Sequence, residues 1–264
     1  MNKMPLDTIG ESSLNPKFTF DSFVVGKSNQ MAYNAARDII TDPGHIHNPF
    51  LIFGGVGLGK THLMHAIGHE ILVKNPEMRV LYVSSETITN ELIDAIKNEK
   101  LEAFRNKYRT LDVLMVDDFE FFCGKKGTQA AILSIFKTLL ESNKRIVLSS
   151  DCPPKKIRKL NEHLLARLES GLIVDIQTPD FDLRVAILKK KAQLDGINIP
   201  DDVLAYIASH IDSNIFKLLG ALSRTVAYAS LNNQSITKEL AADALKNIFM
   251  ECDTPESINE ESKS

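Results

Sequence analysis

The chain has 264 residues, of which 44% are hydrophobic and 25% charged, and its formal net charge is −3. This composition is typical of a folded soluble protein and argues against a disordered chain. No apolar run approaches the roughly 20 residues that span a bilayer, and the N-terminus lacks a secretory apolar core, so we expect a cytoplasmic protein. Cys123, Cys152 and Cys252 are too few and too widely spaced for a disulfide framework or a zinc site.

The charge is distributed unevenly along the chain. Residues 251–264 carry five acidic residues and one lysine, a net charge of −4, which leaves +1 for the remainder. Because this segment is nearly free of apolar residues, we expect a disordered acidic tail there, and we expect a flexible N-terminus over residues 1–13. Because the remainder is nearly neutral, its net charge does not argue for nucleic-acid binding. Any such binding would have to depend on local basic patches.

In chain order, five short runs rich in valine, isoleucine and leucine are predicted to be strands. Segments with helical apolar spacing separate them, such as residues 61–73 and 128–140. Near-continuous apolar strands separated by helices indicate a parallel sheet covered on both faces, which is an α/β fold. The predicted strands are PFLIFG (49–54), RVLYVS (79–84), LDVLMVDD (111–118), RIVLSSD (145–151) and GLIVDIQ (171–177).

From about residue 181 onward the pattern predicts helices only. Gly196 is predicted to end the first of them, and Pro200 with the two aspartates that follow it suits the first turn of the second. A small all-helical subdomain is therefore expected after the sheet. Its predicted helices lie within residues 181–196, 199–211, 213–231 and 237–249.

The segment from Gly54 to Thr61 has the spacing G-x-x-x-x-G-K-T and lies between a predicted strand and a predicted helix. Its glycines free the backbone to wrap phosphate oxygens with N–H groups at the start of the helix. Lys60 would reach the β- and γ-phosphates of a nucleotide, and the Thr61 hydroxyl would bind Mg²⁺. A glycine-rich turn without chemical meaning is the alternative, which this context disfavours. The candidate nucleotide-binding residues are Gly55, Gly57, Leu58, Gly59, Lys60, Thr61 and His62.

Acidic and hydroxyl side chains follow two other predicted strands. Asp117 would serve Mg²⁺, directly or through water, and Asp118 would polarise the attacking water. An ordinary acidic turn is the alternative, and pairing with the phosphate loop makes it less favourable. Ser149, Ser150 and Asp151 end a further strand, where one of them could contact the γ-phosphate or the water, or simply form a cap or turn.

Many blocks of the sequence resemble one family, the AAA+ ATPase module of the bacterial replication initiator DnaA. They include FTFDSFVVGKSNQ, NPFLIFGGVGLGKTHLMHAIG, VLYVSSETITNELIDAI and RLESGLIVDIQTPD, and the resemblance covers about residues 14–249. It implies a P-loop AAA+ core whose five-stranded parallel sheet is flanked by helices, followed by a small helical lid. The implied parts are a nucleotide-binding core over residues 14–179 and a lid subdomain over residues 180–250.

The resemblance also implies roles for individual residues. Val25 and Asn29 would belong to the adenine-side pocket, and Asp151, together with Ser150, would be the first sensor. Arg167 would be the arginine finger that reaches the ATP of a neighbouring protomer.

Two further segments take their meaning from the resemblance. Residues 86–109 resemble the helical pair with which ATP-bound family members stack into a filament around single-stranded DNA. A solvated amphipathic hairpin is the alternative for this segment. Lys125 keeps the first base of the basic stretch that follows the family's acidic strand.

Several positions depart from the family's pattern. The second sensor is usually an arginine, and Phe216 stands in its place, with Lys217 about 100° further around the helix. Gly127 replaces the second base of the basic stretch. His163 occupies a basic position upstream of the finger, and Cys152 replaces the arginine that usually follows the first sensor.

These features predict a DnaA-type ATP-binding protein that acts in or on the initiation of chromosomal DNA replication. We expect ATP or ADP with Mg²⁺, slow hydrolysis, and nucleotide-dependent head-to-tail assembly with itself or with full-length DnaA. Single-stranded DNA would bind through residues 86–109 and Lys125, and without a recognition helix after the lid no sequence-specific duplex binding is expected. The alternatives are a DnaA-related regulatory module, or a helicase loader, with little turnover of its own.

Overall fold

The computed structural model describes residues 14–41, 47–212 and 214–252. The segment 1–13, predicted to be flexible, lies outside these ranges, as does the predicted acidic tail beyond Cys252. The chain divides after Pro179 into two compact units, and each is described by itself. Within the described ranges, none of the helices combines the length and the apolarity that crossing a bilayer requires.

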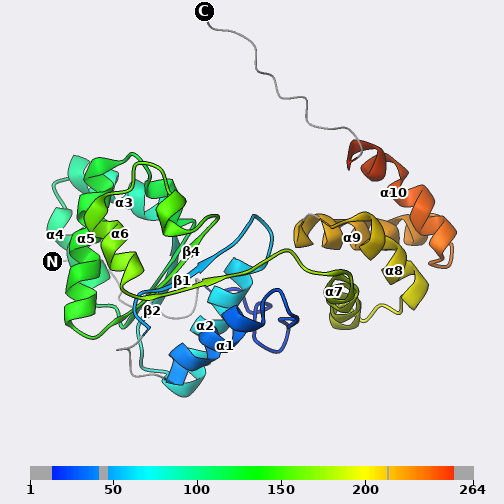
Figure 1. The fold of residues 1–264 in the computed structure, drawn as a ribbon, viewed down its shortest axis with the longest axis horizontal. Helices are drawn as coiled ribbons and strands as arrows, with labels where there is room; N and C mark the ends of the chain where they lie inside the picture. Colours follow the sequence, from blue (N-terminus) through cyan, green and yellow to red (C-terminus); the bar gives the residue numbers. More distant parts are fainter. Residues whose placement is uncertain (1–13, 42–46, 213, 253–264) are drawn as a thin grey trace, which may run out of the picture. The chain divides into compact units, whose positions relative to one another are not determined.

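The first unit contains a sheet of five parallel strands in the order β2-β3-β4-β1-β5 (Figure 1). The predicted α/β fold with its parallel sheet is thus confirmed, and every strand lies within the run predicted for it. Because the strands are parallel, the carboxyl ends of β1, β3 and β4 meet at one edge. The strands are β1 (Phe50–Phe53), β2 (Val80–Ser84), β3 (Val113–Asp117), β4 (Arg145–Ser150) and β5 (Leu172–Asp175).

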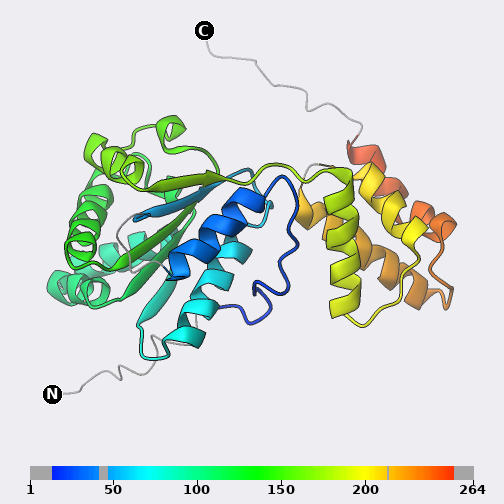
Figure 2. The ribbon, with the colours of Figure 1, turned by 60° about the horizontal axis from the view of Figure 1, so that its bottom comes forward.

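Helices cover both faces of this sheet because alternate strand residues point to opposite sides. Phe50 and Ile52 of β1 pack with α1 and α2, which Figure 2 shows in blue and cyan against one face. Leu51, between them, packs with α3, α4, α5 and α6 on the other face. These helices are α1 (Gln30–Thr41), α2 (Lys60–Lys74), α3 (Ser85–Lys97), α4 (Leu101–Arg109), α5 (Lys126–Glu141) and α6 (Glu162–Glu169), with short 3-10 helices η2 (Phe119–Phe122) and η3 (Pro154–Lys156).

Among the residues that the structure describes, the second unit consists of helices and the loops that connect them, without a strand. The Asp180 side chain caps its first helix by accepting from Leu183 N–H at 2.9 Å, and Gly196 follows the end of that helix with φ 69°. Leucine, isoleucine and alanine side chains of all four helices form its core. The helices are α7 (Phe181–Leu194), α8 (Asp201–His210), α9 (Ile215–Leu231) and α10 (Lys238–Cys252), the last of which ends two residues beyond the boundary predicted at residue 250.

Candidate functional site

The glycine-rich loop leaves β1 in a conformation that only glycine accepts easily. Gly57 and Gly59 have φ values of 76° and 98°, in the left-handed region. A Cβ atom at Gly54 would lie 2.4 Å from the carbonyl oxygen of Ile176, so a side chain cannot fit there. The Gly54 N–H donates to the Ser150 carbonyl at 3.1 Å, which ties the start of the loop to the end of β4.

The backbone N–H groups of this loop and of the first turn of α2 are unpaired. Within the described part of the chain, none of the N–H groups of residues 55–62 donates a hydrogen bond. Such groups at a helix start carry partial positive charge and bind anions, above all phosphate. The loop and helix therefore form a cluster of donors suited to an anionic ligand.

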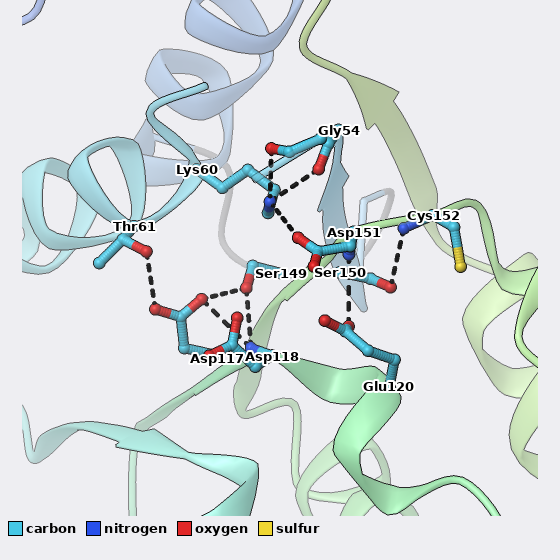
Figure 3. A network of polar contacts seen from close by, with 11 residues as sticks. Gly54, Lys60, Thr61, Asp117, Asp118, Glu120, Ser149, Ser150, Asp151 and Cys152 are labelled. Carbon is cyan, nitrogen blue, oxygen red and sulfur yellow. Dashed lines mark hydrogen bonds and ion pairs between the residues drawn. The ribbon is translucent and has the colours of Figure 1, made fainter. Parts of the chain in front are cut away.

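Lys60 lies at this loop with its side chain only 6% exposed. Figure 3 shows its ammonium group between the loop and the end of β4. It donates to the carbonyl oxygens of Gly54 at 2.7 Å and Gly55 at 3.0 Å, and to Asp151 Oδ1 at 2.7 Å. A buried ammonium that already holds one carboxylate is equipped to hold the oxygens of a phosphate instead.

Asp117, at the end of β3, is 4% exposed and accepts several hydrogen bonds. Its Oδ2 accepts from Thr61 Oγ1 at 2.9 Å and from the Tyr82 hydroxyl at 2.5 Å, and its Oδ1 accepts from the Ser149 hydroxyl and from Asp118 N–H. The Thr61 hydroxyl and the Asp117 carboxylate are thus brought together, as the sequence predicted for a metal site (Figure 3).

These oxygens match the ligands that Mg²⁺ prefers. Among the described residues, no three His, Cys, Asp or Glu side chains are grouped so as to hold a metal ion by themselves. Mg²⁺ is usually bound by one or two protein oxygens together with substrate phosphates and water, so Thr61 and Asp117 beside a phosphate loop suit it.

Asp118 lies in an acidic surrounding next to this pair. Burial, and after it the neighbouring carboxylates of Asp117, Glu120 and Asp151, raise its pKa to about 6 against the opposing charge of Lys60. Its backbone has φ 54°, and its N–H donates to Ser149 Oγ at 3.0 Å. The residue is exposed, so its carboxylate is accessible to solvent beside the phosphate loop.

The two residues predicted for the adenine side belong to one turn before α1. Asn29 is 4% exposed, and its side chain is engaged by the turn itself, since Nδ2 donates to Val24 O at 3.0 Å and Oδ1 accepts from Gly26 N at 2.8 Å. Val25, which lies between these contacts, is half-buried. Asn29 therefore shapes the turn, and only Val25 has a side chain left to contact a base.

Leu58 and His62 serve the fold through their side chains. Leu58 is 6% exposed and belongs to the core between the sheet and α2. The His62 ring contacts the Thr19 carbonyl at 2.9 Å and stacks on Phe18 with ring centroids 4.9 Å apart. Of these two residues, only the backbone N–H groups are thus left to contact a ligand.

The remaining predicted residues lie outside this polar network. Arg167, on α6, is exposed and forms no ion pair with the described residues. Residues 86–109 lie in α3 and α4. Glu91 of α3 joins the two helices, because its carboxylate accepts from Lys107 Nζ at 2.7 Å and from the Tyr108 hydroxyl at 2.8 Å. Lys125 lies with its ammonium 3.0 Å from the centre of the Phe121 ring. In the second unit, Phe216 is 68% exposed.

The sequence analysis did not anticipate Tyr82 and Glu120 in this network. Tyr82 donates to Asp117, and Glu120 Oε2 accepts from Asp151 N–H at 3.3 Å. Ser84 of β2 pairs with Asp117 of β3, and Tyr82 lies two residues before Ser84, on the same face of the strand. The pairing of the two strands is therefore the signal that could have identified Tyr82. Glu120 carries no such signal, because it lies on a short 3-10 helix.

Comparisons with known proteins agree on one family. The family model of the bacterial DnaA ATPase domain matches residues 14–175. Domain III of the Thermotoga maritima replication initiation protein DnaA is 37% identical, with a TM-score of 0.87, over 90% of this chain and 99% of that one. A replication initiator DnaA bound to AMPPCP and single-stranded DNA is 28% identical, with a TM-score of 0.74, over 90% and 82% of the two chains. The Thermotoga maritima RuvB branch migration motor, at 16% identity and a TM-score of 0.63 over 87% and 71%, shares the fold alone.

Proposed function

Because the chain belongs to the family of bacterial DnaA ATPase domains, we propose that it binds ATP or ADP with Mg²⁺ and hydrolyses ATP slowly. The observation that carries the proposal is the row of unpaired N–H groups over residues 55–62, beside the buried ammonium of Lys60. Both attract phosphate, and the DnaA relative solved with AMPPCP holds a nucleotide of this kind.

In this proposal each polar residue of the site has a separate task. Lys60 exchanges its ion pair with Asp151 for the β- and γ-phosphate oxygens. Thr61 and Asp117 hold Mg²⁺, which when bound supplies positive charge to those phosphates. Asp118 orients the attacking water, and Asp151 senses the γ-phosphate after Lys60 releases it.

The wider role follows from the family. We propose that the protein acts in the cytoplasm in the initiation of chromosomal replication, and that it assembles head to tail with copies of itself or with full-length DnaA. Arg167 supports this proposal because it is exposed and free of ion pairs among the described residues. Single-stranded DNA, which a DnaA relative binds, is proposed to contact α3, α4 and Lys125.

A regulatory module that turns over little ATP is the second candidate. Phe216, which stands where the family's second sensor arginine is expected, favours it. A phenyl ring cannot donate a hydrogen bond to a phosphate. In this version Arg167 acts on the nucleotide of an authentic initiator.

Calorimetric titration with ATP and ADP in the presence of Mg²⁺ tests the central proposal. Lys60→Ala is expected to weaken nucleotide binding by about 100-fold or more, because a charge-assisted contact to phosphate is lost. Lys74→Ala, at the exposed far end of the same helix, is the matched control and keeps the affinity of the wild type. Nucleotide binding by Lys60→Ala at wild-type strength would contradict the proposed site.

A further inference from the structure

Two loops of the first unit, far apart in sequence, are held side by side. Gln129, on α5, is 3% exposed, and its Nε2 donates to Phe122 O at 2.8 Å and to Lys159 O at 3.0 Å. Its Oε1 accepts from Asn161 N–H at 2.8 Å. A Cβ atom placed on Gly124 would lie 3.6 Å from Lys159 Cδ. The loop after η2 and the segment leading to α6 therefore form one continuous surface.

This surface is strongly basic, although the whole chain has a net charge of −3. Of the six cations on this surface, only Lys155 has an ion pair with a described residue, a 3.6 Å contact with Glu169, and its side chain remains 81% exposed. Lys125 is half-buried, and the other members are exposed. A group of cations that few carboxylates neutralise attracts a polyanion. We call this set the basic surface: Lys125, Lys126, Lys155, Lys156, Arg158 and Lys159.

An exposed aromatic ring lies at the edge of the basic surface. Phe119 and Phe122 of η2 are fully buried, whereas Phe121 between them is 40% exposed. The Lys125 ammonium covers the Phe121 ring at 3.0 Å, which fixes the ring next to the cations. Exposed aromatic rings beside cations are the combination that single-stranded nucleic acid requires, since bases stack on the ring while the cations follow the backbone.

We propose that the basic surface binds the phosphate backbone of single-stranded nucleic acid and that Phe121 stacks with an unpaired base. The proposal rests on the proposed single-strand binding for Lys125, and it adds Phe121 and the loop from Lys155 to Lys159, which no comparison assigns. Paired bases are not available to stack on a ring, so duplex DNA is the poorer ligand.

The test compares two double variants that remove equal charge. Lys156→Gln with Arg158→Gln alters the basic surface, whereas Lys74→Gln with Lys137→Gln removes two exposed cations from elsewhere in the first unit. Fluorescence anisotropy with a labelled oligothymidine and ATP is measured at several salt concentrations. The first variant is expected to bind about 10-fold more weakly and to lower the slope of log affinity against log salt by about 1.4, from two lost phosphate contacts. The second keeps both values.

Phe121→Leu separates stacking from charge. We expect affinity to fall by between about 5-fold and about 100-fold, with an unchanged salt slope, because one stacked base is lost and no cation. Equal affinity and slope for the two double variants, or equal binding of duplex and single strand, would overturn the proposal, as would an unmodified chain that binds no oligonucleotide. Nucleotide uptake measured on the same preparations reports separately on the proposed ATP site.

Discussion

The carboxylate of Asp117 is held from four directions in the polar network. Thr61 and Tyr82 donate to one oxygen, while Ser149 and the Asp118 N–H donate to the other. A metal ligand fixed in this way needs little reorganisation when the ion binds. Thr61 is itself a proposed ligand, so Tyr82 is the side chain that keeps this oxygen in place when Thr61 turns to the metal.

Tyr82→Phe therefore tests how Asp117 is positioned. We expect the Mg²⁺ concentration for half-maximal hydrolysis to rise by about 10-fold, with maximal turnover less affected, because partners of metal ligands usually contribute about this much. The paramagnetic resonance spectrum of Mn²⁺ bound with ADP should broaden or lose intensity. Tyr33→Phe is the control, since the Tyr33 hydroxyl has no hydrogen bond among the described residues. An unchanged Mg²⁺ requirement would remove Tyr82 from the site.

At the scale of elements, the histidines of α2 attach the segment before α1 to the helix. His65 accepts from Asn15 N–H through Nδ1 at 3.1 Å, and His69 Nε2 contacts the Asn15 carbonyl at 2.8 Å. His62 contacts the Thr19 carbonyl in the next turn of the chain. This attachment places residues 15–22 beside the helix that begins with Lys60 and thus supports the phosphate loop.

The attachment makes the stability of the first unit depend on pH. Burial lowers the pKa of His65 to about 4, against an opposing influence of Asp117, while the unfolded value is about 6.5. The unfolded chain therefore takes up the proton first, and the stability that a neutral His65 provides at pH 7 is lost as the pH falls from about 6.5 to 4.

Urea unfolding at pH 7 and pH 5 measures this loss. We expect about 2 kcal/mol less stability at pH 5 from His65 alone. His65→Asn, whose side-chain oxygen can replace Nδ1 as an acceptor without binding a proton, should flatten the difference between the two pH values. His210→Asn, on an exposed helix end of the second unit, is the control and should retain it. If His65→Asn lost as much unfolding free energy between pH 7 and pH 5 as the wild type, this account would be refuted.

At the scale of the molecule, the first unit carries both the polar network around Lys60 and Asp117 and an exposed arginine outside it. Arg167 belongs to α6, whose start is capped by the Asn161 side chain and whose Leu164 and Leu168 are buried. The helix is therefore anchored while Arg167 points away from the core. Such an arginine can add charge to the phosphates of a neighbouring protomer without any change in its own unit.

Arg167→Ala is expected to lower protein-concentration-dependent ATP hydrolysis by about 10³-fold or more while leaving ATP affinity of the isolated chain unchanged, because the group acts in trans. Steady-state hydrolysis over a range of protein concentrations checks the loss of turnover, and calorimetry checks that ATP affinity is unchanged. Mixing the variant with a Lys60→Ala chain provides the control, since the second variant still offers Arg167. Turnover that does not depend on Arg167 would exclude the finger.

Local pattern was sufficient for the elements and for the phosphate loop. Short runs rich in valine, isoleucine and leucine predicted the five strands, and helical apolar spacing predicted helices between and after them. The spacing around Lys60 predicted the donor loop between strand and helix. Family resemblance identified the chain, which the comparisons confirm. The assigned roles of the site residues stay predictions.

The meeting of Thr61 and Asp117 was expected from the sequence, whereas only the tertiary structure decided which other side chains contact them. Strand order inserts β4 between β3 and β1, so Ser149 reaches Asp117 while Asp151 reaches Lys60, and no spacing along the chain contains that order. The same holds for Gln129, which joins two loops into the basic surface. Elements follow from interactions between near neighbours in sequence, which the sequence by itself determines, whereas contacts between elements depend on how buried faces pack together.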